Sequence, residues 1–168
     1  MVVAALTACS SPAATTSETA SGTGPSASIS GTQFDGVSVS GALGSPPELL
    51  VGDDTQQTSN LQYKDVVVGT GATATATSKV TVNYVAKSAK TKRPYDSSWD
   101  RGKAFSYDPT KITFKAFTEG VPGMKVGGRR IVVVPGPLAY GANPPSWSGL
   151  GPNETLVFVI DLVSVDSP

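Results

Sequence analysis

Residues 155–165 read Thr-Leu-Val-Phe-Val-Ile-Asp-Leu-Val-Ser-Val and form the longest strand that the 168-residue sequence predicts. Side chains alternate between the two faces of a strand, so one face of this segment carries Leu156, Phe158, Ile160 and Leu162. The other face carries Val157, Val159 and Val163 and is also mostly apolar. Because a strand with two apolar faces must be covered on both sides, we expect this segment at the centre of a sheet.

Four further segments have the composition of strands, which favours Val, Ile, Tyr and Phe. They are residues 61–68, 79–86, 105–107 and 129–134. The second segment alternates clearly, because Val80, Val82 and Tyr84 share one face. Gly69 follows the first segment and Pro135 follows the last, as expected where strands end.

One segment has the spacing of a helix. Its apolar residues, at intervals of 3, 4 and 3, are Phe114, Phe117, Val121 and Met124. Gly120, Pro122 and Gly123 lie in the same stretch and limit the helix to about two turns. The sequence therefore predicts an α+β fold, in which one short α-helix packs on a twisted antiparallel sheet of about five strands.

The residue types that are missing exclude several kinds of site. The chain contains no His and one Cys, so it has no Ser-His-Asp triad, no His-containing zinc site and no internal disulfide bond. The formal net charge is zero, which argues against general nucleic-acid binding. The sequence also lacks the glycine-rich motifs that bind phosphates. We expect no metal, no cofactor and no nucleic-acid partner.

Charge is distributed unevenly along the chain. Residues 1–63 contain five acidic residues and neither Lys nor Arg, whereas the sequence from Lys64 onward has 13 basic and 8 acidic residues. The two parts therefore differ in character although the total is neutral. Taken alone, Lys125, Arg129 and Arg130 are most simply interpreted as a solvated basic rim.

The N-terminus predicts a lipid anchor. Residues 1–9 are apolar and end in Leu-Thr-Ala-Cys, which resembles a bacterial lipobox, so we expect Cys9 to carry a lipid. Only eight residues precede Cys9, and a full signal peptide has a basic segment and a longer apolar stretch. We therefore interpret residues 1–9 as a signal remnant. The alternative is a lone Cys in an Ala-rich tail.

Two segments separate this remnant from the main domain at residues 61–168. Residues 10–30 consist almost entirely of Ser, Thr, Ala, Gly and Pro, and we expect a disordered, flexible linker. Residues 31–60 contain more apolar residues, and Val37 and Val39 alternate with serines. This pattern predicts a short strand that is added to the main domain.

Several motifs, taken in order, resemble those of the FK506-binding-protein (FKBP) type of peptidyl-prolyl isomerase. They are Val80-Thr-Val-Asn-Tyr84, Tyr95-Asp-Ser-Ser-Trp-Asp-Arg-Gly102, Glu119-Gly-Val-Pro-Gly-Met-Lys-Val-Gly-Gly-Arg-Arg130, Leu138-Ala-Tyr-Gly141 and Thr155-Leu-Val-Phe158. The resemblance covers about residues 61–165 and implies a sheet wrapped around one short helix. The lipobox, the linker and Trp99-Asp-Arg-Gly are similar to secreted actinobacterial members. They imply a protein outside the cytoplasm, anchored to the cell membrane.

The same resemblance implies an aromatic pocket. Tyr84 and Tyr95 would form one wall, with Phe105 at the base and Phe158 at the back. Phe117 takes the position of the floor, which is usually Trp in this family, and Tyr95 stands where Phe is more common. The residues implied in catalysis are Tyr84, Asp96, Phe117, Tyr140 and Phe158.

Polar groups are implied at the edge of the pocket. Asp96 would pair with Arg101 and orient a hydroxyl, without acting as a general base. In the pair Thr113-Phe114, the backbone N–H of Phe114 would donate to a substrate carbonyl, and the Tyr140 hydroxyl would donate to a second one. The loop 142–150 would overhang the mouth and contact the ligand through Trp147 and Leu150.

Isomerisation of a prolyl bond suits a chain without His or metal, because no covalent bond breaks. We expect a monomeric prolyl isomerase that acts on proline-containing segments of exported proteins, with FK506 and rapamycin as further ligands. The first alternative is a catalytically weak FKBP-like chaperone or peptide-binding module, because Phe117 is smaller than the usual Trp. The second is a solute-binding lipoprotein with an unrelated pocket.

Overall fold

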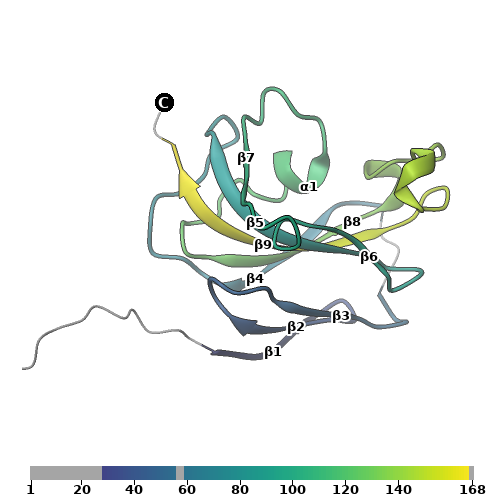
Figure 1. Cartoon of the computed structure of the whole chain (residues 1–168), viewed down its shortest axis with the longest axis horizontal. Helices are drawn as coiled ribbons and strands as arrows, with labels where there is room; N and C mark the ends of the chain where they lie inside the picture. The colour runs from purple at the N-terminus through teal and green to yellow at the C-terminus, as the bar shows by residue number, and fades with distance from the viewer. Residues whose placement is uncertain (1–27, 56–58, 167–168) are drawn as a thin grey trace, which may run out of the picture.

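The computed structural model describes residues 28–55 and 59–166. In this part of the chain the main sheet has six antiparallel strands. Across the sheet they are β4 (Gln62–Val67), β8 (Arg129–Val134), β9 (Leu156–Val165), β5 (Val80–Ser88) and β6 (Pro94–Ser97), and β7 (Phe105–Tyr107) also pairs with β5. Strand β9 lies between β8 and β5, so the central position expected for residues 155–165 is confirmed (Figure 1).

The helix is shorter than the spacing of its apolar residues predicts. Helix α1 (Lys115–Thr118) has 4 residues, about one turn, so the expected second turn is wrong. The chain bends at Gly120, where a β-carbon would collide with the carbonyl oxygen of Ala116. Val121 and Met124 are buried all the same, because they reach the core from the turn that follows. No helix in the described ranges is long and apolar enough to span a membrane.

The main sheet carries an apolar core on each of its faces. Helix α1 packs on one face, where the buried residues include Tyr84, Phe117, Phe158 and Ile160. The core of the opposite face contains Ile131, Val133, Val157 and Val159. These two cores explain why β9 is apolar on both sides.

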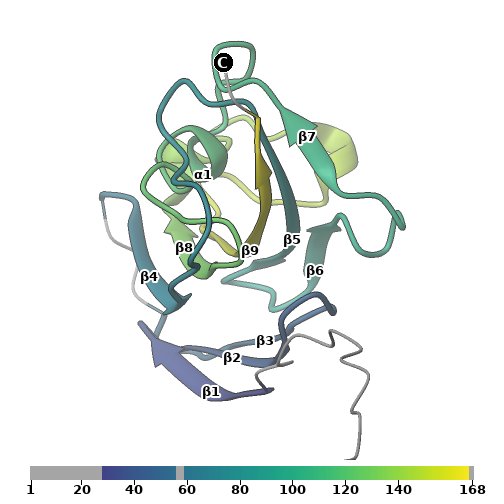
Figure 2. The ribbon, with the colours of Figure 1, turned by 90° about the vertical axis from the view of Figure 1, so that its left-hand side faces the viewer.

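A second, three-stranded sheet covers the face of the main sheet that lies opposite α1 (Figure 2). Its antiparallel strands are β1 (Ser28–Phe34), β2 (Val37–Ala42) and β3 (Glu48–Val51). Val37, Val39 and Leu49 are buried against the main sheet. The single added strand expected within residues 31–60 is therefore a complete small sheet. Residues 28–30 belong to β1 and not to the linker, and the rest of the linker lies outside the described residues.

A buried arginine joins the two sheets. The Arg129 side chain is 0 % exposed, and its guanidinium donates to the two carboxylate oxygens of Asp161 over 2.5 and 2.6 Å. It also donates to the carbonyl oxygens of Gly41, Ala42 and Ser45 over 3.0–3.2 Å. Burial raises the pKa of the Asp161 carboxyl, and the hydrogen bonds from Arg129 oppose that shift.

The interpretation of the basic cluster as a solvated rim holds for Lys125 alone. Arg130 is buried like its neighbour, and its guanidinium binds Asp65 and the carbonyl oxygens of Gly120 and Pro122. These two charged side chains can be buried because carboxylate and carbonyl oxygens accept the hydrogen bonds that each guanidinium would otherwise make to water.

Lysines of the main domain also bind the N-terminal segment that contains the three-stranded sheet. Lys64 donates to the Gln33 carbonyl over 3.0 Å, and Lys87 donates to the Leu49 carbonyl over 2.6 Å. Lys92 reaches the carbonyl of residue 52. The basic residues from position 64 onward thus bind backbone oxygens of an N-terminal segment that has no basic residue of its own.

The small sheet is expected to stabilise the whole domain. Leu49→Ala should lower the free energy of unfolding by about 2–5 kcal/mol, because Leu49 is 2 % exposed and its removal leaves a cavity between the sheets. Urea unfolding of residues 28–168 measures the change. The matched control is Leu50→Ala on the same strand, where the side chain is 56 % exposed and the expected change is within about 0.5 kcal/mol. Equal effects of the two changes would contradict the packing described here.

Candidate functional site

A hollow of about 180 Å³ opens on the α1 side of the main sheet. Its walls come from β5, β6, β7, β9, α1 and the segments before α1 and after the 3₁₀ helix η1 (Gly136–Leu138). The lining residues are Tyr84, Tyr95, Asp96, Phe105, Ile112, Phe114, Phe117, Tyr140 and Phe158. An apolar cavity of roughly 150 Å³ can hold benzene, so this hollow has room for one small ring.

The walls are aromatic rings in mutual contact. The ring centroid of Tyr84 lies 5.2 Å from that of Phe117 and 6.0 Å from that of Phe158. Phe158 lies beside Ala86 on the neighbouring strand, and this small side chain leaves space for the ring. Tilted and edge-on contacts of this kind are favourable, and they hold the wall rigidly.

Three polar side chains close one edge of the hollow. The Tyr84 hydroxyl donates to Asp96, and Arg101 forms an ion pair with the same carboxylate. Arg101 Nη2 also donates to the Tyr84 hydroxyl over 2.8 Å, and the Ser97 N–H donates to Asp96 Oδ1 over 2.8 Å. Both carboxylate oxygens therefore have partners. The arrangement suits a group that orients its neighbours, not one that removes a proton from a ligand.

The hydroxyls of Tyr84 and Tyr95 keep their protons well above neutral pH. Burial raises the pKa of Tyr84 to about 12; the hydrogen bond to Asp96 adds to this shift, and that from Arg101 opposes it. Burial also raises the pKa of Tyr95, and its hydrogen bond with Tyr140 acts in the same direction. Both hydroxyls are therefore neutral at neutral pH, and that of Tyr84 donates its proton to Asp96.

A hydroxyl bridge joins two walls of the hollow. The Tyr95 and Tyr140 hydroxyl oxygens are 2.6 Å apart, and their ring centroids are separated by 6.0 Å. The Tyr140 ring also contacts Phe114, with a centroid distance of 5.3 Å. The sequence placed both tyrosines at the pocket, but it gave no signal that their hydroxyls would meet, because they lie on separate segments.

The backbone at the start of α1 presents a hydrogen-bond donor. The Phe114 carbonyl accepts from the N–H groups of Phe117 and Thr118, which fixes the first turn. The N–H of Phe114 itself has no acceptor within residues 28–55 and 59–166. It lies at a lining residue of the hollow, as the sequence led us to expect.

Other expected residues lie elsewhere. Thr113 is exposed, and Ile112 lines the hollow in its place; the alternation of Ile112 and Phe114 was the signal that could have identified it. Trp147 is 76 % exposed on the 3₁₀ helix η2 (Ser146–Ser148), and the structure does not bring it to the hollow. Leu150 packs on the core behind it and is not a lining residue.

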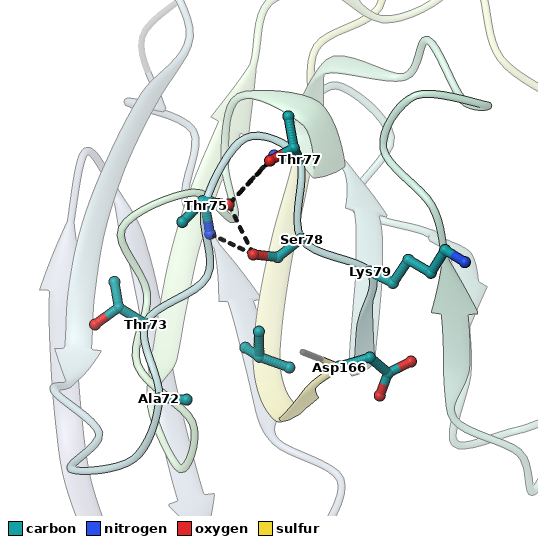
Figure 3. A pocket seen from close by; sticks show the side chains of 8 residues that line it. Ala72, Thr73, Thr75, Thr77, Ser78, Lys79 and Asp166 are labelled. Atoms are coloured by element: carbon teal, nitrogen blue, oxygen red, sulfur yellow. Dashed lines mark hydrogen bonds between the residues drawn. The ribbon is translucent and has the colours of Figure 1, made fainter. Parts of the chain in front are cut away.

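Larger hollows lie outside the aromatic cluster. One of about 560 Å³ adjoins it and is lined by Arg101, Lys103 and Phe105 among others. Another, of about 460 Å³, has Lys79 and Asp166 at its rim and a network of threonine and serine hydroxyls (Figure 3). These hydroxyls bind one another, and the lining contains no aromatic side chain. The smaller aromatic hollow is therefore the better candidate for specific recognition.

Comparisons with known proteins place the chain in a family. Residues 71–163 match the family model of FKBP-type peptidyl-prolyl cis-trans isomerases. A probable FK506-binding protein of Corynebacterium glutamicum is 43% identical over 106 residues, which cover 62% of this chain and 86% of that protein. The FK506-binding protein of Streptomyces anulatus is 39% identical, with coverage of 64% and 87%.

Solved structures of similar proteins support the same family assignment. FkpA from Escherichia coli aligns with a TM-score of 0.56 and 34% identity, covering 66% of this chain and 51% of that chain. The structure of AtFKBP13 aligns with a TM-score of 0.57 and 28% identity, covering 66% and 96%. The chain therefore belongs to the FKBP-type peptidyl-prolyl cis-trans isomerase family, and its activity is the cis–trans isomerisation of peptide bonds that precede proline.

Proposed function

We propose that the aromatic hollow is the active site, that it holds the proline ring of a substrate, and that FK506-type macrolides compete for it. The observation that carries this proposal is the enclosure of about 180 Å³ by aromatic rings, with hydrogen-bond donors at the edge. A monomer supplies all of these groups, so no second subunit is needed.

The proposed mechanism is desolvation of the amide. Resonance keeps the prolyl amide planar, and rotation must overcome ~18–20 kcal/mol. The planar amide has more separated charge than the twisted one, so water stabilises the ground state more than the transition state. The rings of Tyr84, Phe117 and Phe158 exclude water from the amide, and this favours the twisted form.

Exclusion of water is useful only if the flanking chain is held. We assign this role to two donors, the Phe114 N–H and the Tyr140 hydroxyl, each of which would bind a carbonyl oxygen of the substrate. Asp96 and Arg101 keep Tyr84 in place on the wall through the hydrogen bonds described above.

The Asp96 carboxylate is the first test of the site. Asp96→Asn should lower kcat/KM about tenfold and weaken FK506 binding by a similar factor, because hydrogen bonds to a charged group are replaced by weaker neutral ones. A protease-coupled isomerase assay on a proline peptide and a binding titration with FK506 measure the two effects.

The matched control for this change is Asp100→Asn, which alters an exposed carboxylate in the turn that follows β6. We expect this control to keep the activity of the parent protein. If Asp96→Asn folds normally and is fully active, Asp96 has no part in the site.

Activity should be independent of pH between ~pH 6 and ~pH 9, because the chain has no His and Tyr84 and Tyr95 hold their protons in this range. Above this range, the raised pKa of Tyr84 contributes stability that is complete below ~pH 10, its ordinary pKa, and is lost as pH rises through about 12. Exchange between cis and trans peptide, measured by NMR, avoids a pH-sensitive protease. A step in rate near neutral pH would contradict this account.

We also propose that the enzyme is anchored outside the cytoplasm by a lipid on Cys9 and acts on exported proteins. The lipobox sequence and the Ser- and Thr-rich segment that follows it support this proposal. The position of Ser28, where the described chain begins, agrees with it, because β1 lies on the opposite side of the main sheet from the hollow. A flexible tether that joins the domain on that side does not have to pass the hollow.

Cys9→Ser should prevent lipid attachment. In a bacterium that expresses the native gene, the variant should leave the membrane fraction and lose labelling by a fatty-acid analogue, while isomerase activity is unchanged. Ser10→Ala is the control and should remain labelled. A Cys9→Ser protein that is still labelled and membrane-bound would overturn the proposed anchor.

A further inference from the structure

The hydroxyl bridge between Tyr95 and Tyr140 connects two independent parts of the fold. Tyr95 comes from β6, an edge strand that pairs only with β5 in the described sheet. Tyr140 follows η1, in a loop that is tied to itself by the hydrogen bond from the N–H of residue 141 to the carbonyl of residue 136, over 2.8 Å. Both rings line the hollow, so the bridge joins two parts of its wall.

The protons of the bridge can be counted. Each hydroxyl has one proton to donate and two lone pairs that accept. If Tyr140 donates to Tyr95, its proton is already used, and a substrate carbonyl must break the bridge to obtain it. If Tyr95 donates to Tyr140, the bridge is intact and the Tyr140 proton is free for the substrate. For a carbonyl that binds at the Tyr140 hydroxyl, as proposed above, only the second arrangement satisfies both hydroxyls and the carbonyl at once.

We propose that Tyr95 is a positioning residue of this isomerase: its hydroxyl donates to Tyr140 and thereby holds the Tyr140 proton towards the carbonyl of the bound proline peptide. The proposal rests on the proposed role of Tyr140 as a donor to the substrate. Tyr95 acts in two ways. It limits rotation of the Tyr140 hydroxyl, and by donating to this oxygen it makes the Tyr140 O–H a stronger donor.

The surroundings of Tyr95 allow it to donate in this direction and keep Tyr140 within its reach. Its hydroxyl remains protonated, because burial and the nearby Asp96 charge both raise its pKa. The Tyr140 ring is held at its other side by Phe114, so the oxygen stays within reach of the bridge. Phe114 also carries the unpaired backbone N–H, so the two proposed substrate donors share one packed unit.

A double-mutant cycle tests the proposal. The variants are Tyr95→Phe, Tyr140→Phe and the double variant, and kcat/KM and FK506 binding are measured for each. Tyr95→Phe should lower kcat/KM roughly 2- to 10-fold, the range expected for one neutral hydrogen bond. In the Tyr140→Phe background, the same change should have no further effect, because Tyr95 acts through Tyr140.

Two outcomes overturn the inference while leaving the proposed active site intact. Tyr95→Phe has no effect, or its effect is equally large in the presence and absence of the Tyr140 hydroxyl, which indicates a purely structural contribution. A fully active Tyr140→Phe enzyme instead removes Tyr140 from the site, and the proposed donor role fails together with the inference.

The control is Tyr63→Phe, which removes a hydroxyl on β4 from a residue that is 50 % exposed and outside the hollow. It should leave kcat/KM unchanged. Urea unfolding of every variant separates a change in activity from a change in stability, because the expected fall in kcat/KM applies to fully folded protein.

Discussion

The fold depends on covering both faces of one strand. Strand β9 is buried along most of its length, and neither of its faces can meet water without cost. One face packs under the aromatic rings and α1, and the other packs under β2 and β3. The elements that form the aromatic hollow and the N-terminal sheet therefore cover the two faces of the same central strand. Loss of either covering would expose apolar surface in the middle of the domain.

Alternation and strand-forming composition predicted much of this fold. The strand at 79–86 was expected within a few residues of its bounds because polar and apolar residues alternate along it. The strands at 129–134 and 155–165 were expected because they are runs of Val, Ile, Leu and Phe. The helix was overestimated because buried positions at helical spacing also occur in a turn. The small sheet was missed because β1 and β2 are rich in Ser and Gly, and the Pro46-Pro47 pair interrupts the pattern before β3.

The candidate site also contains some features that the sequence predicted and others that it did not. Tyr84, Asp96 and Phe158 lie on or next to regular strands, where register determines direction, and they meet as expected. The loop residue Trp147 does not join them, because local hydrogen bonds set the path of η2. Burial of Arg129 and the meeting of the two tyrosine hydroxyls depend on partners far away in the chain. A pattern of neighbouring residues in the sequence cannot reveal such long-range contacts.

The attachment of the N-terminal sheet has a consequence for how this protein can evolve. Lys64, Lys87 and Arg129 bind it largely through carbonyl oxygens of the main chain. A carbonyl is present whatever side chain the residue carries. Most exposed side chains of this segment can therefore change without loss of the hydrogen bonds that hold it against the main domain. The N-terminal segment can therefore change in sequence while its position on the main domain is conserved.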